Sequence, residues 1–241
     1  ADFGILEPNQ YAFRMGGTTA APIDVATAVF EKRSRPTHVI ALDATSAYDT
    51  VNTRALGSVF TRLGAPPRFI NWVMNTTGGH SRLISTPGGI SESPFELGGL
   101  PQGDPMSCFI WLAVCDVALS HAANTKSHGV LLAAKGQVPG RLDEIRTKAQ
   151  GYADDLMAFG ETAEEVTETA QLMTDALGVM NIRVQAKKCI YLRNVAAAEG
   201  DSEAPRNLEG LPVQIEGTTH IITRNSKVGR FGNSWKAGDT A

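Results

Sequence analysis

Acidic residues stand at the edges of two apolar stretches, where their carboxylates could bind a divalent cation. Asp43 follows the apolar run at residues 37–42, and Asp154 and Asp155 are adjacent in a second such stretch. Neighbouring carboxylates repel each other and stay ionised only when something offsets their charge. Magnesium prefers such oxygen ligands and often shares substrate phosphates, and a pair of these ions can activate a hydroxyl and stabilise a leaving pyrophosphate. We therefore expect metal-dependent phosphoryl transfer at these three acids.

Each acid also has a plainer explanation. An isolated Asp-Asp pair is most often an exposed hairpin turn, because turns favour Asp. Asp43 alone could be an ordinary strand-end acid. A third segment, GLPQGDPMS at residues 99–107, could be a simple loop and helix cap. It could instead be a loop whose glycines let a base pair approach, with Gln102 reaching the template or the nucleotide.

In these segments the sequence resembles the reverse transcriptases, most closely those of non-LTR (LINE-type) retrotransposons and, as second choice, those of group II introns. LDATSAYDTV at residues 42–51 is similar to the first metal motif, and YADD at residues 152–155 to the second. GLPQGDPMS is similar to the template-grip loop that stands between them. The three motifs occur in the family's order, which is a more specific signal than YADD alone.

The resemblance implies a role for each acid. Asp43 and Asp154 would each ligate both of two Mg²⁺ ions, together with the backbone carbonyl of Ala44, and Asp155 would complete the cluster. Mn²⁺ could replace Mg²⁺. Asp49 is interpreted as structural, as a cap of the following helix.

The resemblance also implies substrate contacts. Tyr48 would lie beneath the deoxyribose and exclude a 2′-hydroxyl, although it could be an ordinary core aromatic. The other expected substrate-binding residues are Gln102, Gly103, Arg14 and Lys188, with Lys187 as the alternative lysine near the triphosphate. Arg14, in QYAFR at residues 10–14, could equally be a surface arginine. VGRFG at residues 228–232 is similar to a primer-grip turn, with Phe231 where Leu is usual.

The expected activity is RNA-directed DNA polymerisation, with an RNA template, a DNA primer and a dNTP as partners. Tyr48 and YADD disfavour an RNA-dependent RNA polymerase. A catalytically inactive nucleic-acid-binding scaffold stays open. A metal-dependent hydrolase of small molecules would leave GLPQGDPMS unexplained. The expected location is intracellular, in nucleus or cytoplasm, and the sequence does not indicate an oligomeric state.

Composition limits these interpretations. The 241 residues are 42% apolar, enough for one sizeable core. The net charge of −3 is unusual for a nucleic-acid enzyme, although residues 183–236 hold nine Lys or Arg against five acids. The three cysteines form no CxxC pair, which favours reduced thiols over a disulfide framework or a zinc site. No apolar run of about 18 residues suggests a membrane span, so we expect no membrane partner.

Hydrophobic periodicity and turn signals predict helices at residues 19–33, 52–63, 68–76, 106–121 and 162–177, the last capped by Thr162 and ended by Gly178. They predict a strand at residues 37–43 and three hairpins: residues 82–97 around Pro87-Gly88-Gly89, residues 149–159, and residues 213–222 around Gly217. This pattern indicates an α+β fold, a polymerase palm with an antiparallel sheet packed on helices. We assign residues 1–36 to partial fingers and residues 37–193 to the palm with inserted finger elements. Residues 194–241 would be a linker and a possible primer-grip hairpin, with the thumb absent. Such a chain is expected to be a fragment with weak activity on its own.

Overall fold

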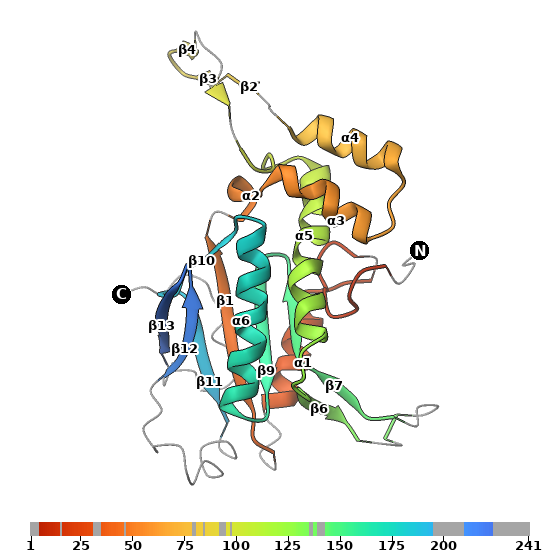
Figure 1. Cartoon of the computed structure of the whole chain (residues 1–241), viewed down its shortest axis with the longest axis vertical. Coiled ribbons are helices and arrows are strands. Elements are labelled where there is room, and N and C mark those ends of the chain that lie inside the picture. The colour runs from red at the N-terminus through yellow and green to blue at the C-terminus, as the bar shows by residue number, and fades with distance from the viewer. Residues whose placement is uncertain are drawn as a thin grey trace.

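The computed structural model describes residues 5–14, 16–30, 35–45, 47–78, 81–83, 85–91, 95–96, 98–134, 137–138, 143–194 and 210–223. Its centre is a five-stranded antiparallel sheet (Figure 1). Strand β1 (His38–Thr45) pairs on one side with β9 (Asp155–Gly160), which continues the sheet to β8 (Ala149–Tyr152). On its other side β1 pairs with β10 (Arg183–Val184) and with β11 (Ile190–Arg193). Both metal motifs therefore contribute central strands.

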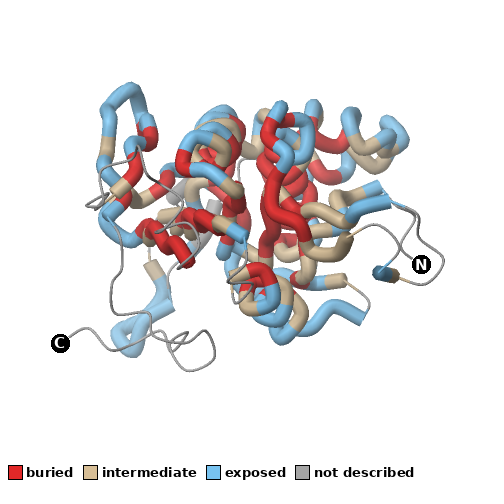
Figure 2. The backbone as a smooth tube through the Cα atoms, turned by 90° about the horizontal axis from the view of Figure 1, so that it is seen from below, coloured by how far each residue is buried: buried red, intermediate tan, exposed pale blue. Residues whose placement is uncertain are grey.

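Alternation along the strands directs side chains to two different hydrophobic clusters. Ile40 and Leu42 face the cluster that contains α5 (Pro105–Ala123) and α6 (Ala163–Val179). Val39, the residue before Ile40, points to the opposite face and packs in the smaller cluster that contains α1 (Ala20–Phe30). Figure 1 shows α5 and α6 side by side on one face of the sheet. Figure 2 shows buried residues concentrated in the interior and exposed residues around the edges. The sheet is thus covered on both faces away from its acidic end.

Helix α5 is apolar around its whole circumference because it runs through the core. Asp104 caps its first turn by accepting a hydrogen bond from the Met106 backbone N–H at 2.9 Å, and Pro105 occupies the first helical position. The helix is long and apolar enough to cross a membrane, but 61% of its most apolar 18-residue stretch is buried inside the fold. The sequence interpretation that no such run exists was therefore wrong. Core packing accounts for this apolarity.

Two sets of elements are inserted between the strands that carry the acids. Between β1 and α5 lie α2 (Ala47–Thr50), a 3₁₀ turn (Thr53–Ala55), α3 (Leu56–Arg62), α4 (Pro67–Thr77) and four short strands. These strands are β2 (Ser81–Arg82), β3 (Ser85–Thr86), β4 (Gly89–Ile90) and β5 (Phe95–Glu96). Between α5 and β8 lie β6 (Val130–Ala133) and β7 (Ile145–Thr147). Figure 1 shows the two insertions projecting at opposite ends of the molecule.

A last hairpin, β12 (Gly210–Ile215) and β13 (Thr218–Thr223), turns at Glu216-Gly217 as the sequence predicts. It packs beside α6, where Gln171 and Gln214 exchange hydrogen bonds of 3.0 and 2.7 Å. Of the expected linker and primer-grip region at residues 194–241, residues 195–209 and the primer-grip turn at residues 228–232 lie outside the described residues. The predicted division into fingers, palm and linker therefore stays a prediction.

The α+β class and the antiparallel sheet are confirmed, while several local predictions were wrong. Asp49 does not cap the next helix, since the Asn52 side chain accepts the Arg54 N–H at 3.2 Å instead. The predicted helix at residues 52–63 begins as a 3₁₀ turn. Gly178 does not end α6, because the helix continues through Val179. The hairpin at residues 82–97 forms two short ladders, with Gly89 in a strand rather than in the turn.

Candidate active site

The strand register brings the first and second metal motifs together. Asp43 of β1 lies directly opposite Asp155 of β9 in the antiparallel ladder. Side chains in such positions have Cβ atoms roughly 5 Å apart. Tyr152 pairs with Asp155 across the β8–β9 hairpin, so Ala153 and Asp154 form its two-residue turn. Three carboxylates from two segments therefore meet at one end of the sheet.

The turn that carries Asp154 is hydrogen-bonded to α5. Ala153 adopts a left-handed backbone conformation with φ of 54°, which is uncommon for a residue other than glycine. The Cys115 thiol of α5 donates a hydrogen bond to the Ala153 carbonyl oxygen at 3.3 Å. Burial, and then the nearby Asp154 and Asp116, raise the pKa of Cys115 well above its ordinary value. The thiol is therefore protonated near neutral pH and available as the donor.

The carboxylates also disturb one another electrostatically. Burial raises the pKa of Asp155 above its ordinary value, and the charges of Asp154 and Asp43 raise it further. Asp43 is 38% exposed as a side chain, yet its Oδ1 atom is buried and has no hydrogen-bond partner. Lys188 Nζ lies 3.5 Å from this oxygen, close enough for an ion pair but outside hydrogen-bond geometry. The distance identifies Lys188 as a neighbouring charge that leaves the Asp43 lone pairs unsatisfied.

These features suit a divalent cation. An unsatisfied buried carboxylate oxygen and three mutually repelling acids are both stabilised by added positive charge, and their hard oxygen atoms are suitable ligands for Mg²⁺. Within the residues that the structure describes, no three His, Cys, Asp or Glu side chains are already gathered into a complete metal-ligating group. The acids would therefore have to close around an ion by side-chain rotation.

Tyr48 lies in α2, directly after the strand that carries Asp43. Its ring stacks on Trp111 of α5, with centroids 5.1 Å apart and planes inclined by 24°. Burial first, followed by the nearby Cys108 and Asp154, raises the pKa of Tyr48 far above its ordinary value. The phenol is therefore neutral, half-buried and within the field of Asp154.

The GLPQGDPMS loop docks on the same turn. The Leu100 N–H donates to the Tyr48 carbonyl oxygen at 2.6 Å, and Gln102 Nε2 donates to Asp49 Oδ2 at 3.2 Å. Gly103 is exposed and has a positive φ of 89°. The structure thus brings Gln102 and Gly103 next to the Tyr48 segment, and Asp49 acquires a partner that the sequence did not indicate.

Arg14 is placed differently from the other predicted residues. Its Nη1 donates to the carbonyl oxygens of Glu7 at 2.7 Å and Gln10 at 3.1 Å, within its own segment. Lys187 is exposed, and of the two lysines it is Lys188 that contacts Asp43. The geometry therefore favours Lys188 over Lys187 as the lysine of the site.

Sequence reasoning missed Cys115, Trp111 and Gln185 as neighbours of the acids. The Gln185 N–H donates to the Asp43 carbonyl oxygen at 2.9 Å, which fixes β10 and the following turn beside β1. Cys115 and Trp111 looked like ordinary members of an apolar helix. Their contacts join residues tens of positions apart, and local periodicity carries no such information.

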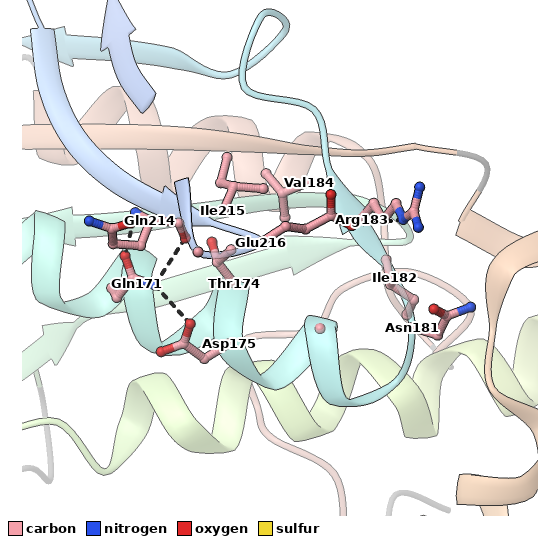
Figure 3. Close-up of a pocket in the computed structure, with 12 residues that line it drawn as sticks. Gln171, Thr174, Asp175, Asn181, Ile182, Arg183, Val184, Gln214, Ile215 and Glu216 are labelled. Carbon is pink, nitrogen blue, oxygen red and sulfur yellow. Dashed lines mark hydrogen bonds and ion pairs between the residues drawn. The ribbon is translucent and has the colours of Figure 1, made fainter. Parts of the chain in front are cut away.

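A cavity of about 690 Å³ lies between α6, β10 and the β12–β13 hairpin (Figure 3). It contains none of the predicted site residues. Arg183 at its edge forms an ion pair with Glu216 at 2.8 Å, and Val184 in its wall pairs with Ala44 of β1. The cavity therefore lies beyond the β10 edge strand and is not the place where the carboxylates meet.

Comparison with known proteins agrees with this geometry. The family described as "Reverse transcriptase (RNA-dependent DNA polymerase)" matches residues 2–214. The retrovirus-related Pol polyprotein from type-2 retrotransposable element R2DM of Drosophila melanogaster is 25% identical over 170 residues, which cover 70% of this chain. The corresponding polyprotein from type-1 retrotransposable element R2 of Popillia japonica is 26% identical over 199 residues, which cover 81% of this chain. The matches span only 15% and 26% of those two proteins.

Solved structures show the same fold. Telomerase from Candida tropicalis, in a complex with a fragment of telomeric RNA, covers 88% of this chain at 11% identity with a TM-score of 0.53. An apo telomerase of the same organism, truncated from its C-terminal domain, covers 86% at 12% identity with a TM-score of 0.50. The matched parts are 34% and 39% of those chains. The two acidic motifs meet across β1 and β9, and the family match covers most of the chain. The chain therefore belongs to the reverse transcriptases, and it is similar to the polyproteins of R2 retrotransposable elements.

Proposed function

We propose that this chain forms the catalytic centre of an RNA-directed DNA polymerase of a retroelement. The observation that carries the proposal is the pairing of Asp43 with Asp155, which also brings Asp154 to the same end of the sheet. Reverse transcriptases generally use divalent metal ions. The chain spans only part of its relatives, so its activity, substrates and partners are inferred from this site and from family membership.

Asp43, Asp154 and Asp155, with the carbonyl oxygen of Ala44, would hold two Mg²⁺ ions, which Mn²⁺ could replace. When bound, such ions lower the cost of deprotonating a primer 3′-hydroxyl and neutralise charge on a leaving pyrophosphate. The unsatisfied Oδ1 of Asp43 supports this assignment, because a buried carboxylate oxygen without a partner is costly. The raised pKa of Asp155 also supports it, because a nearby cation would stabilise the ionised form of this carboxyl.

The reaction joins the primer 3′-oxygen to the α-phosphorus of a dNTP. The new P–O bond forms as the bond to pyrophosphate breaks, and the hydroxyl proton is lost. Lys188, beside Asp43, is suited to bind the triphosphate, because its charge is already directed at the acidic cluster. Positioning and charge neutralisation account for most of the rate enhancement in phosphoryl transfer.

Tyr48 would select the sugar. Its ring is fixed against Trp111, so it cannot move aside for an added 2′-hydroxyl without losing that stacking contact. Gln102 and Gly103 would contact the template or the incoming nucleotide from the exposed loop next to Asp49. Arg14 is also proposed for phosphate binding, with its guanidinium oriented by the two hydrogen bonds that Nη1 donates to the carbonyl oxygens of Glu7 and Gln10.

RNA template, DNA primer and dNTP are thus the proposed partners, and we place the reaction inside the cell. Residues 1–36 would belong to the fingers and residues 37–193 to the palm. Regions outside this chain would supply much of the basic surface for the duplex, since the net charge of the chain is −3.

The test is primer extension on an RNA template with Mg²⁺ and dNTPs, using the protein of the full reading frame. Asp154→Asn is nearly isosteric and removes one charge of the cluster. We expect a loss of roughly 10³-fold or more in kcat, because electrostatic contacts to transferring phosphates carry most of the catalysis. Asp175→Asn is the matched control, since Asp175 is an exposed acid on α6. Equal activity in the wild-type protein and in Asp154→Asn would contradict the proposal. No primer extension by the wild-type protein, with template binding retained, would indicate an inactive scaffold.

A further inference from the structure

Residues 7–14, here called the strap, lie beside the strand that leads into the catalytic turn. Gln10 forms a parallel bridge with Gly151 of β8. The Tyr11 N–H donates to the Gly151 carbonyl oxygen, and the Gly151 N–H donates to the Asn9 carbonyl oxygen, both at 2.9 Å. Both backbone groups of Gly151 are therefore held by the strap, two residues before the Ala153-Asp154 turn.

The strap is anchored on α5 by a buried acid. Asp116 is 1% exposed, and its Oδ1 accepts a hydrogen bond from the Glu7 N–H at 2.5 Å. Its Oδ2 forms an ion pair with Arg62 of α3. At the other end of the strap, Arg14 Nη1 closes the segment onto the carbonyl oxygens of Glu7 and Gln10. The strap thus has a fixed anchor on the helix beneath the site.

The fit between the strap and β8 is tight at Gly151. A Cβ atom there would lie 2.9 Å from Leu156 Cδ2 and 3.1 Å from Gln10 Nε2. Both distances are shorter than ordinary carbon contacts, so the ends of the Leu156 and Gln10 side chains would have to shift. Glycine inside a strand commonly marks such a close approach.

Cys115, the residue before Asp116, reaches the same hairpin at another point. Its thiol contacts the Ala153 carbonyl oxygen directly, whereas Asp116 acts on Gly151 through the strap. Two consecutive residues of one helix therefore restrain both the tip of the catalytic turn and the strand that leads into it. α5 is a rigid element with eleven buried residues, so it is a firm reference for that position.

We propose that Cys115 and Asp116 are positioning residues that set the place of Asp154 relative to Asp43, Cys115 through the turn and Asp116 through the strap and Gly151. This proposal rests on the proposed function. Neither residue is assigned a contact with substrate. In catalysis a displacement of about 1 Å can cost roughly 100-fold in rate, so weak contacts that fix a catalytic turn can have large kinetic effects.

The experiment measures kcat and KM for dNTP with the full reading-frame protein on a primed RNA template, together with the thermal unfolding midpoint. Cys115→Ala removes the donor and is expected to lower kcat about 10-fold, with KM for dNTP changed less than about 2-fold, because the turn acts in the transition state. Cys115→Ser keeps a donor and is expected to restore kcat to within about 3-fold of the wild type. Val114→Ala is the matched control. It opens a cavity at the neighbouring buried position of α5 and removes no hydrogen bond to the turn, so it should lower the unfolding midpoint while kcat stays within about 2-fold.

The strap is tested by Asp116→Asn, Asp116→Ala and Gly151→Ala. Asn still accepts the Glu7 N–H and should keep kcat within about 3-fold, whereas Ala should lower it about 10-fold. Should Asp116→Ala fail to fold, Gly151→Ala is the second variant: it crowds the Gln10 side chain of the strap without removing a buried charge, and it should lower kcat by about 5-fold or more at constant KM.

Unchanged kcat in both Cys115→Ala and Gly151→Ala would overturn the positioning proposal. The proposal would also be overturned if Val114→Ala lowered kcat as much as its lower unfolding midpoint predicts from the other variants. Failure of Cys115→Ser to recover kcat would overturn it as well. Asp154→Asn in the same assay distinguishes failure of the proposed function from failure of the positioning proposal. If Asp154→Asn retains activity, the proposed function itself fails. If it is inactive while Cys115→Ala and Gly151→Ala are both fully active, only the positioning roles are refuted.

Discussion

At the scale of single residues, the neighbouring Lys187 and Lys188 allow the contribution of one lysine near Asp43 to be compared with that of an exposed lysine beside it. Only Lys188 lies at ion-pair distance from Asp43, while both side chains are exposed. Lys188→Ala should lower kcat/KM for dNTP by about 10- to 100-fold, because it removes a positive charge beside the transferring phosphates. Lys187→Ala should change it less than about 3-fold. Single-nucleotide extension measures both, and a larger effect at Lys187 would reverse the assignment.

Tyr48 gives a second prediction at this scale. Replacing the fixed ring with Val should open space near the sugar and raise kcat/KM for an rNTP relative to the matching dNTP by about 10- to 100-fold, the range that one steric contact can supply. The comparison uses the same primer on the same RNA template. Unchanged discrimination would show that the stacking of Tyr48 on Trp111 serves only the core.

At the scale of elements, the GLPQGDPMS loop and the turn after β1 are fitted to each other through Gly99. Its φ is +75°, and a Cβ atom would overlap the backbone carbonyl oxygens of Tyr48 and Asp49, which cannot rotate away. Gly64 has nearly the same φ, +74°, with nothing within 4 Å of a Cβ. Comparing alanine substitutions at Gly64 and Gly99 therefore separates the cost of backbone strain from the cost of a close contact.

Gly64→Ala should cost about 1 kcal/mol of unfolding free energy, the strain of a positive φ. Gly99→Ala should cost roughly 2 kcal/mol more, since overpacking adds about 1–3 kcal/mol. Chemical denaturation of both variants measures the difference. Equal costs would show that the loop can lift from the Tyr48 turn without penalty, contrary to the docking seen here.

Among the elements, long helices were predictable from the sequence and very short strands were not. Long periodic segments such as α6, and its cap Thr162, were predicted well, because periodicity and capping are local. The four two-residue strands between α4 and α5 were not, because a ladder of that length depends on pairing across the insertion more than on its own residues. At the site, ordered motifs identified the acids. The bonds from Cys115 to Ala153 and from the strap to Gly151 follow only from tertiary packing.

At the scale of the whole molecule, basic residues are concentrated in one part of the sequence, and the chain as a whole is slightly acidic. Nine Lys or Arg stand in residues 183–236, yet the whole chain carries a net charge of −3. Because phosphate contacts dominate nucleic-acid affinity, this chain alone should bind a primed RNA template weakly. Its affinity should fall less steeply with salt than that of the full reading-frame protein.

Primer extension by the 241-residue chain should accordingly be weak and distributive, with short products that shorten further when a trap RNA is added. The full reading-frame protein should give longer products under the same conditions. Robust processive synthesis by the chain alone would contradict this division of labour between the catalytic centre and its surroundings.

The central claim, that Asp43, Asp154 and Asp155 form one metal centre, is tested most directly by counting bound ions. Mn²⁺ binding is measured by electron paramagnetic resonance in a complex of the full reading-frame protein with RNA template, dideoxy-terminated primer and dNTP. The wild-type protein and Asp175→Asn should each bind two Mn²⁺ ions tightly, and Asp43→Asn should lose at least one of them. Two tightly bound ions in Asp43→Asn, with unchanged affinity, would contradict the account.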